Sequence, residues 1–310
     1  MSLLARLRDP KVIVGLVAGA IALSLLLSFA DIRKVGQAFQ HFPPILIPII
    51  FGLVAAREIV RVLEWHYLLN TLGHKPLLRH SILSLLGGDA SQILPAGVYF
   101  QNYLRQQAEG TAFATSLAAT LAMQLLEAAV SLLVLALVNV PGWDWLRPVA
   151  VLVMAGYMAF LLLISRPGVV TWLEGRAARK NYGSWLLDQL AHFLEGLECL
   201  MTPGVALRAA ALTASYLVFT VGAFYVILQA YGLPGIGPAQ AAAIYCFVLT
   251  LIILVPLPSD LGLSEGSGVT ILLAYGVPLA EGLTIMLIIR FATLLFTEAI
   301  AGISITLLHG

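Results

Sequence analysis

The stretch from Val255 to Gly268 sets the strongest limit on how this chain can fold. It lies inside a strongly apolar region, yet it contains two prolines, three glycines and two carboxylates. Proline removes a backbone hydrogen-bond donor and glycine loosens a helix, and hydrocarbon offers no replacement partners. Interrupted backbone persists at membrane depth only where protein or a water-filled cavity surrounds it. We therefore predict a discontinuous or re-entrant segment that lines a polar cavity.

The composition indicates a membrane protein. Apolar residues make up 60% of the chain, charged residues only 11%, and the mean hydropathy is +0.95. The apolar runs extend for about 20 residues without strict alternation, which favours helices over barrel strands. The fold class that follows is all-α, a polytopic helical membrane protein. A net charge of +1 gives no sign of nucleic-acid binding.

We predict a single transmembrane domain over residues 1–310, with six full spans and two re-entrant segments. The predicted spans are Val12–Ala30, Ile45–Asn70, Ala112–Val138, Val149–Ile164, Ala209–Tyr231 and Glu281–Leu308. The re-entrant segments are Ser81–Leu94, which is too short to span, and the broken stretch with its flanks, Ala239–Gly276. The basic and then apolar N-terminus resembles a signal peptide, but it shows no small-residue cleavage site, so we expect a retained helix.

The distribution of positive charge orients this arrangement. Lys and Arg number eleven in the predicted cytoplasmic segments and three in the predicted external ones. This excess predicts a cytoplasmic N-terminus, and six spans return the C-terminus to the same side. Residues 165–208 form the only sizeable cytoplasmic loop, and its amphipathic part, Trp185–Met201, is expected to lie on the inner membrane face.

Two parts of the chain, about 81–139 and 239–308, resemble each other. Each contains a Leu-Pro motif, followed by a polar stretch with glycine and a long apolar helix. Pro95 and Glu127 are 32 residues apart, as are Pro258 and Arg290. In the predicted topology the two units enter from opposite sides, which is the layout of an inverted repeat with a substrate site near the midplane. The alternative explanation is that the prolines and the equal spacing match by chance.

Four charged residues lie within the second span. Arg57, Arg61 and Glu64 share one helical face, and Glu58 is next to it. Each ionised group at the bilayer centre costs about 2.5–3.5 kcal/mol on insertion scales. The cluster is either a structural ion-pair network or a site for an anionic headgroup. The flat, bidentate donors of arginine suit phosphate and favour the second interpretation.

The other intramembrane charges leave similar alternatives. Glu127 and Arg290 could pair across the two repeat helices, or contact substrate. Asp260 and Glu265 lie in the broken stretch, where a carboxylate could cap the exposed N–H groups of a half-helix. Such a half-helix N-terminus could also hold a phosphate directly.

Catalytic and cofactor motifs are not found in the sequence. The six histidines are scattered, so we predict no metal site. No phosphate-binding loop of an ATPase and no nucleophile motif occurs. We therefore expect no cofactor, and a transporter rather than an enzyme.

The C-terminal third carries a recognisable pattern. Pro-x-Pro-x-x-Leu-Gly-Leu-x-Glu covers residues 256–265, followed by Tyr275-Gly-Val277, Ala280 and Arg290. It resembles the signature of the lysylphosphatidylglycerol synthase transmembrane-region family, in which Gly262, Glu265 and Arg290 match. Matching features in the first half are Arg61 with Trp65, and Leu94-Pro95 before Arg105. The paired glycines of the family are replaced by Ser259-Asp260, and the arginine before its glutamate by Ser264, so the headgroup chemistry can differ.

The resemblance implies a flippase-like domain of the bacterial or archaeal inner membrane that binds and moves a lipid. Some members carry a fused soluble aminoacyl-transfer domain, which we do not expect here, and so we do not expect lysine transfer. The predicted substrate-binding residues, for an anionic phospholipid headgroup, are Arg57, Arg61, Glu64, Arg105, Glu127, Asp260, Gly262, Glu265 and Arg290. The expected partners are membrane lipids and a soluble or membrane partner enzyme.

Two other functions remain open at this point. One is a membrane enzyme or accessory subunit that acts on polyprenyl-linked glycans or hopanoid-type lipids. The other is an ion-coupled transporter of a small solute, for which broken helices are equally suitable.

Overall fold

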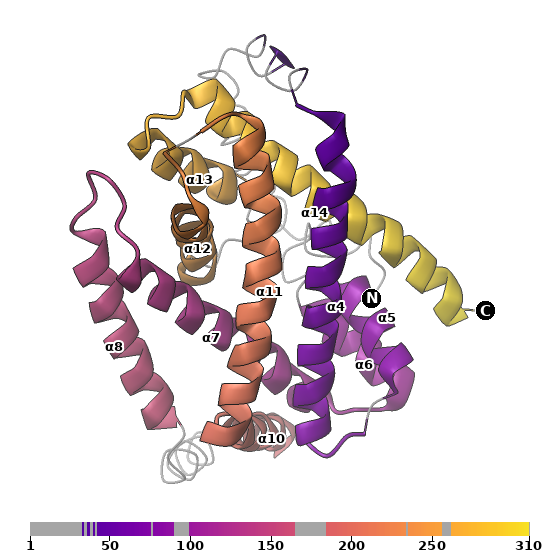
Figure 1. Ribbon diagram of the computed structural model, residues 1–310. Coiled ribbons are helices and arrows are strands. Elements are labelled where there is room, and N and C mark those ends of the chain that lie inside the picture. Colours follow the sequence, from indigo (N-terminus) through magenta and orange to yellow (C-terminus); the bar gives the residue numbers. More distant parts are fainter. Residues whose placement is uncertain are drawn as a thin grey trace.

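The chain is almost entirely helical where its structure is described. The computed structural model describes residues 33, 36–37, 40, 42–75, 77–89, 99–164, 184–233, 235–255 and 262–309. Within these ranges there are ten α-helices and the short 3-10 helix η1 (Pro44–Leu46), and no strand (Figure 1). The all-α prediction is therefore confirmed for this part of the chain. The predicted first span, Val12–Ala30, lies outside the described residues.

Two long helices, α4 (Ile47–Thr71) and α11 (Pro203–Ala230), lie side by side through the middle of the molecule. Figure 1 shows that they run in opposite directions. Each has a proline in its first turn, where a missing N–H leaves no helical bond unmade. Both were predicted as spans. Helix α11 begins six residues earlier than predicted, at Pro203 rather than Ala209.

The chain between these two helices forms α5 (Leu78–Asp89), α6 (Phe100–Glu109), α7 (Phe113–Leu137), α8 (Leu146–Ile164) and α10 (Ser184–Leu200). Helix α5 corresponds to the predicted short segment Ser81–Leu94. Helix α6 was not predicted, because its polar sequence has no apolar run. It ends at Gly110, whose φ of 69° is the left-handed conformation that stops many helices. Helices α7 and α8 confirm two predicted helical segments.

Helices α5 and α6 approach each other through the glycine pair Gly87-Gly88. A Cβ atom on Gly88 would lie 2.5 Å from Cβ and 2.9 Å from the backbone N of Gln101 on α6. A Cβ atom on Gly87 would lie 2.6 Å from the side chain of Leu104. The packing of these helices therefore requires glycine at position 88, where the backbone of α6 lies in the way, whereas at position 87 the end of the Leu104 side chain could move aside.

We expect Gly88→Ala to lower the free energy of unfolding by about 1–3 kcal/mol, because α6 must shift to admit the methyl group. The measurement is thermal or denaturant unfolding of the purified protein in detergent. Gly52→Ala in α4 is the matched control, because nothing lies within 4 Å of its Cβ position. The control should be neutral or stabilising, since alanine favours helix more than glycine does. Equal stability of the two variants would contradict the close α5–α6 contact.

The last part of the chain contains the predicted interruption. Helix α12 (Pro238–Leu254) stops shortly before the proline-containing stretch, and α13 (Leu263–Ala274) begins just after Gly262. Gly262 has a φ of 81°, which L side chains rarely adopt. Helix α14 (Leu279–His309) follows and packs on α13. The prediction of a discontinuous helix in this region is confirmed.

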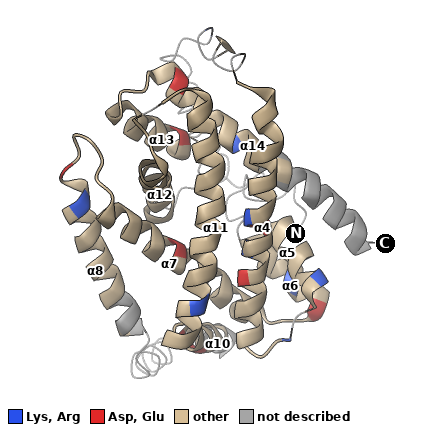
Figure 2. Ribbon diagram, in the orientation of Figure 1, with Lys and Arg blue, Asp and Glu red and all other residues tan. Residues whose placement is uncertain are grey.

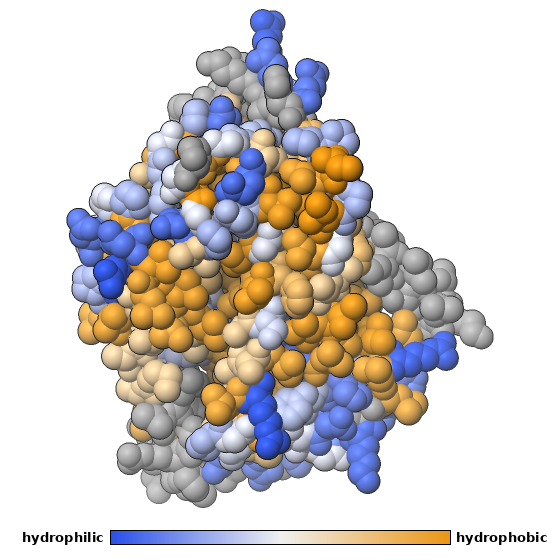
Figure 3. Space-filling model, viewed as in Figure 1, coloured by the Kyte–Doolittle hydropathy of each residue, from blue (hydrophilic) through white to orange (hydrophobic). Residues whose placement is uncertain are grey.

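A broad apolar band crosses the surface. Figure 3 shows orange side chains across the middle of this face and blue ones toward its top and bottom. The exposed large apolar side chains of the described residues include Ile59 of α4, Leu133 of α7, Leu152 of α8 and Val218 of α11. Of the described helices, α7 and α11 are long and apolar enough to cross a membrane by length and composition. Helix α4 is also 25 residues long, but it carries the charged cluster.

Helix α10 (Ser184–Leu200) corresponds to the predicted amphipathic segment Trp185–Met201. Its residues Leu194, Leu197 and Leu200 are buried, and the helix packs chiefly on α7. A Cβ atom on Gly196 would lie 3.0 Å from Cβ of Ala118. The apolar face of α10 is therefore covered by protein over these residues.

Candidate substrate-binding site

The charged residues of α4 lie near the middle of the helix. Arg61 is the fifteenth of its 25 residues. Figure 2 shows the charges of α4 and α7 as isolated coloured segments within otherwise tan helices. Glu58 and Glu64 are 3% and 2% exposed, so both carboxylates are removed from solvent.

Each charge on α4 has a partner. Arg57 forms an ion pair with its neighbour Glu58, with Nη2 and Oε1 2.7 Å apart. Arg61 Nη1 lies 3.6 Å from Oε2 of Glu127 on α7. Glu64 Oε1 accepts a hydrogen bond of 2.6 Å from the Thr213 hydroxyl of α11. The predicted residues Arg57, Arg61, Glu64 and Glu127 therefore form one cluster, which we call the central cluster.

Tyr216 of α11 joins the two arginines of the central cluster. Its ring centre is 5.6 Å from Cζ of Arg57 and 5.0 Å from Cζ of Arg61. These distances lie within the range of cation–π attraction. Tyr216 is the fourteenth of 28 residues in α11, and Glu127 the fifteenth of 25 in α7. Three helices thus meet near their midpoints around two guanidinium groups.

Sequence reasoning did not identify Thr213 or Tyr216. Their spacing of three residues places them on one face of α11, which is a signal that is visible in the sequence. Nothing in one sequence shows that this face meets α4, however.

The broken helix is held by a second set of residues. Glu265, which is 1% exposed, accepts the backbone N–H of Gly262 at 2.8 Å and the Ser264 hydroxyl at 3.0 Å through Oε2. Its other oxygen, Oε1, lies 2.6 Å from Nη1 of Arg290 on α14. The same Arg290 nitrogen also donates to Ser264 Oγ at 2.6 Å. Glu265 therefore caps the half-helix α13, as one of the two predicted alternatives states.

The pairing of the intramembrane charges differs from the one considered from sequence. Glu127 lies beside Arg61, and Arg290 lies beside Glu265. The suggested pairing of Glu127 with Arg290 is therefore wrong, because each residue forms its ion pair with a different partner. Glu127 and Arg290 each pair with a residue of another helix, and helical spacing in the sequence does not identify that helix.

Arg105 belongs to a third group, on α6. Its side chain is fully buried and its Nη2 is paired with Oε2 of Glu109. The other oxygen of Glu109 is 2.7 Å from Nδ1 of His80 and accepts the Leu77 N–H at 3.1 Å. These contacts place Arg105 in a cluster separate from that of Arg57 and Arg61. Asp260 lies outside the described residues.

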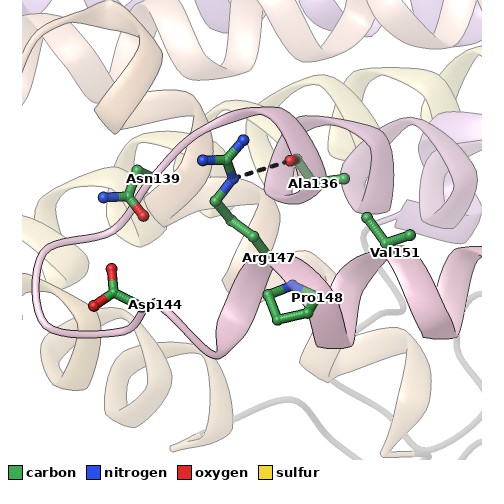
Figure 4. Close-up of a pocket in the computed structure, with 6 residues that line it drawn as sticks. All are labelled: Ala136, Asn139, Asp144, Arg147, Pro148 and Val151. Atoms are coloured by element: carbon green, nitrogen blue, oxygen red, sulfur yellow. Dashed lines mark hydrogen bonds between the residues drawn. The ribbon is translucent and has the colours of Figure 1, made fainter.

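A surface hollow of about 440 Å³ lies where α7 turns into α8 (Figure 4). Its lining contains Asn139, Asp144 and Arg147, and Arg147 Nε donates to the carbonyl of Ala136 at 3.3 Å. None of the predicted site residues lines this hollow. In the described part of the chain, no group of three His, Cys, Asp or Glu side chains is placed to hold a metal ion.

The comparison with known families decides what kind of chain this is. Residues 12–301 match the family described as the lysylphosphatidylglycerol synthase TM region. The chain belongs to this family. No curated protein matches the chain closely enough to report.

Membership in the lysylphosphatidylglycerol synthase transmembrane-region family covers nearly the whole chain. It confirms the resemblance seen in the sequence, and it identifies a membrane protein from a family related to lipid handling. The helical structure and the apolar surface band agree with this assignment.

Proposed function

We propose that this protein is a lipid translocator that takes an anionic phospholipid headgroup into the central cluster while the acyl chains stay in the bilayer. The observation that carries the proposal is the convergence of Arg57 and Arg61 on Tyr216 near the midpoint of three helices. Charged side chains at such depth are costly, and in membrane proteins they usually mark a substrate or ion pathway.

The chemistry of this cluster suits a phosphodiester. Guanidinium groups present several N–H donors in a plane and bind phosphate oxygens in pairs. In the resting state Glu58 and Glu127 balance the two arginines, so the positive charge is not exposed to hydrocarbon. An arriving phosphate would compete with Glu127 for Arg61, whose 3.6 Å ion-pair distance is longer than a direct hydrogen bond. Glu64 and Glu127 then shape the site or take part in proton coupling.

The order of helices supports an inverted repeat. Helices α4 to α7 and α11 to α14 each follow the sequence long, short, short, long. Figure 1 shows α4 and α11 running in opposite directions, and likewise α7 and α14. Such repeats frequently place substrate near the midplane, between broken segments. In this proposal Gly262, Glu265 and Arg290 hold the second broken segment beside the pathway, and Asp260 is a further substrate-binding residue.

The proposed topology has six spans, with both termini in the cytoplasm of a bacterial or archaeal cell. The proposed partners are membrane lipids, with a partner enzyme as a supplier or user of the moved lipid.

The test is a translocation assay with the purified protein in liposomes that contain labelled phospholipids. Headgroups of different charge are compared, and we expect anionic lipids to cross faster than zwitterionic ones. The control is liposomes without protein. Equal movement of all headgroups, or none with folded protein, would contradict the proposal. The second result would favour a partner-dependent enzyme or a carrier of small solutes.

A further inference from the structure

Helix α6 buries three polar side chains on one face. Gln101, Asn102 and Arg105 are at most 4% exposed, whereas Gln106 and Gln107 are exposed. Gln101 Nε2 donates to Thr120 Oγ1 at 2.7 Å, and Thr120 Oγ1 donates to Asn102 Oδ1 at 3.0 Å. These bonds fix α6 against α7.

Several buried donors on this face have no hydrogen-bond partner in the part of the chain that the structure describes. Arg105 uses only Nη2, for its ion pair with Glu109, and its Nε and Nη1 make no hydrogen bond. Nδ2 of Asn102 makes none either. Asn102 and Arg105 are both 0% exposed, so water at the surface does not satisfy these groups. Buried donors without acceptors are costly, and an ion is one of the recognised explanations for them.

The unpartnered donors lie close together along α6. Residues three positions apart on a helix are neighbours on its surface, with Cβ atoms about 5–6 Å apart. The side chains of Asn102 and Arg105 are therefore neighbours on the buried face of α6. An acceptor that reaches both needs several oxygen atoms and a negative charge.

Glu109 holds Arg105 in place and ties this region to the loop between α4 and α5. It contacts Arg105, His80 and the Leu77 N–H together. Burial, and then the nearby charge of Arg105, lower the pKa of His74 in this loop, while the charge of Glu109 opposes this shift. The exposed Arg79 adds positive charge at the same end of α5.

We propose that Arg105 and Asn102 form a second anion site, for a phosphate group, separate from the central cluster. Its ligand is either inorganic phosphate or the phosphate of a lipid headgroup. Binding of a lipid phosphate rests on the proposed function, in which this site would hold the headgroup as it enters or leaves the central cluster. The site itself does not depend on translocation.

The decisive variant is Asn102→Asp. Aspartate keeps the acceptor for Thr120, but it replaces the unpartnered amide by a carboxylate oxygen beside Arg105. We expect this built-in anion to occupy the donors of Arg105 and to weaken phosphate binding about tenfold or more, as for the loss of a charge-assisted hydrogen bond. The control is Gln106→Glu, which makes the same charge change on the exposed face of the same helix.

Binding is measured on the full-length protein by thermal stabilisation and calorimetry. One arm uses detergent-solubilised protein with inorganic phosphate against chloride at equal ionic strength. The other uses nanodiscs of phosphatidylglycerol against phosphatidylcholine. A response to inorganic phosphate that Asn102→Asp removes and Gln106→Glu keeps supports the site, and a response to phosphatidylglycerol alone assigns it to lipid. The variant without ligand should melt no lower than wild type.

Two results would overturn the second site. One is the lack of any response of the wild type in both arms. The other is an equal response of Asn102→Asp and wild type. If the protein binds phosphate at this site but moves no lipid, the proposed translocation is rejected and the second site is supported. Failure of the proposed function can therefore be distinguished from failure of the second site.

Discussion

Arg61→Ala is expected to reduce headgroup-dependent lipid movement in liposomes by at least about tenfold, which corresponds to roughly 1.4 kcal/mol of lost interaction. The guanidinium of Arg61 is the group that links Glu127 of α7 to the ring of Tyr216 of α11. Without it, a phosphate at the midplane loses its bidentate partner and meets the unbalanced charge of Glu127. The measurement is the initial rate for an anionic lipid against a zwitterionic one.

Two further variants separate substrate binding from structural ion pairing. Arg61→Lys keeps the positive charge beside Glu127 but lacks the flat fork and the stacking surface, so we expect intermediate activity. The double variant Arg61→Gln, Glu127→Gln removes both charges and leaves neither partner buried alone, so it should fold. If the pair is only structural, this double variant transports like wild type. If Arg61 binds phosphate, it is inactive despite normal folding.

Arg147→Gln is the matched control, because it removes one exposed arginine from the first turn of α8. Its transport rate should equal that of wild type. A similar loss in Arg147→Gln and Arg61→Ala would indicate a general effect of charge rather than a site, and would contradict the role given to Arg61.

The interruption before α13 could be predicted from sequence because it depends on local chemistry. Pro256 and Pro258 lack N–H groups, and Gly262 allows the left-handed conformation that the structure shows. The adjoining helices followed from apolar run length, which is also a local property. The cap formed by Glu265 was predicted as an alternative for the same reason, since it lies three residues after Gly262.

The ion-pair partners could not be predicted in this way. Helical spacing places Arg61 on a face of α4, but it does not say which helix covers that face. The structure places Tyr216 and Glu127 on that face, and it pairs Arg290 with Glu265 rather than with Glu127. These are tertiary contacts between residues far apart in the chain, and one sequence carries little information about them.

Helix α6 shows a different limit. Its sequence, Phe-Gln-Asn-Tyr-Leu-Arg-Gln-Gln-Ala-Glu, is polar overall, and its few apolar residues, Phe100, Tyr103, Leu104 and Ala108, share one face of the helix. The buried face is the polar one, because Gln101, Asn102 and Arg105 pack inward with hydrogen-bond and ion-pair partners. Hydrophobic periodicity does not identify a buried face that is made of polar groups.

The Glu265–Arg290 pair is expected to show the largest effects on stability. Arg290→Met leaves the Glu265 carboxylate buried beside Gly262 and Ser264 without its cation. Removing one partner of a buried ion pair typically costs about 3–5 kcal/mol. Glu265→Gln should cost less, because glutamine can still accept the Gly262 N–H, as it does in a capping box. The measurement is the free energy of unfolding in mixed micelles.

The double variant Glu265→Gln, Arg290→Met decides between a structural and a substrate role for this pair. It keeps the cap of α13 and removes both charges, so we expect it to regain most of the stability that Arg290→Met loses. A double variant that is stable and still transports would assign the pair to holding the broken helix. A stable variant without transport would place Arg290 or Glu265 on the lipid pathway. If the double variant is as unstable as Arg290→Met, the two residues do not act as a pair.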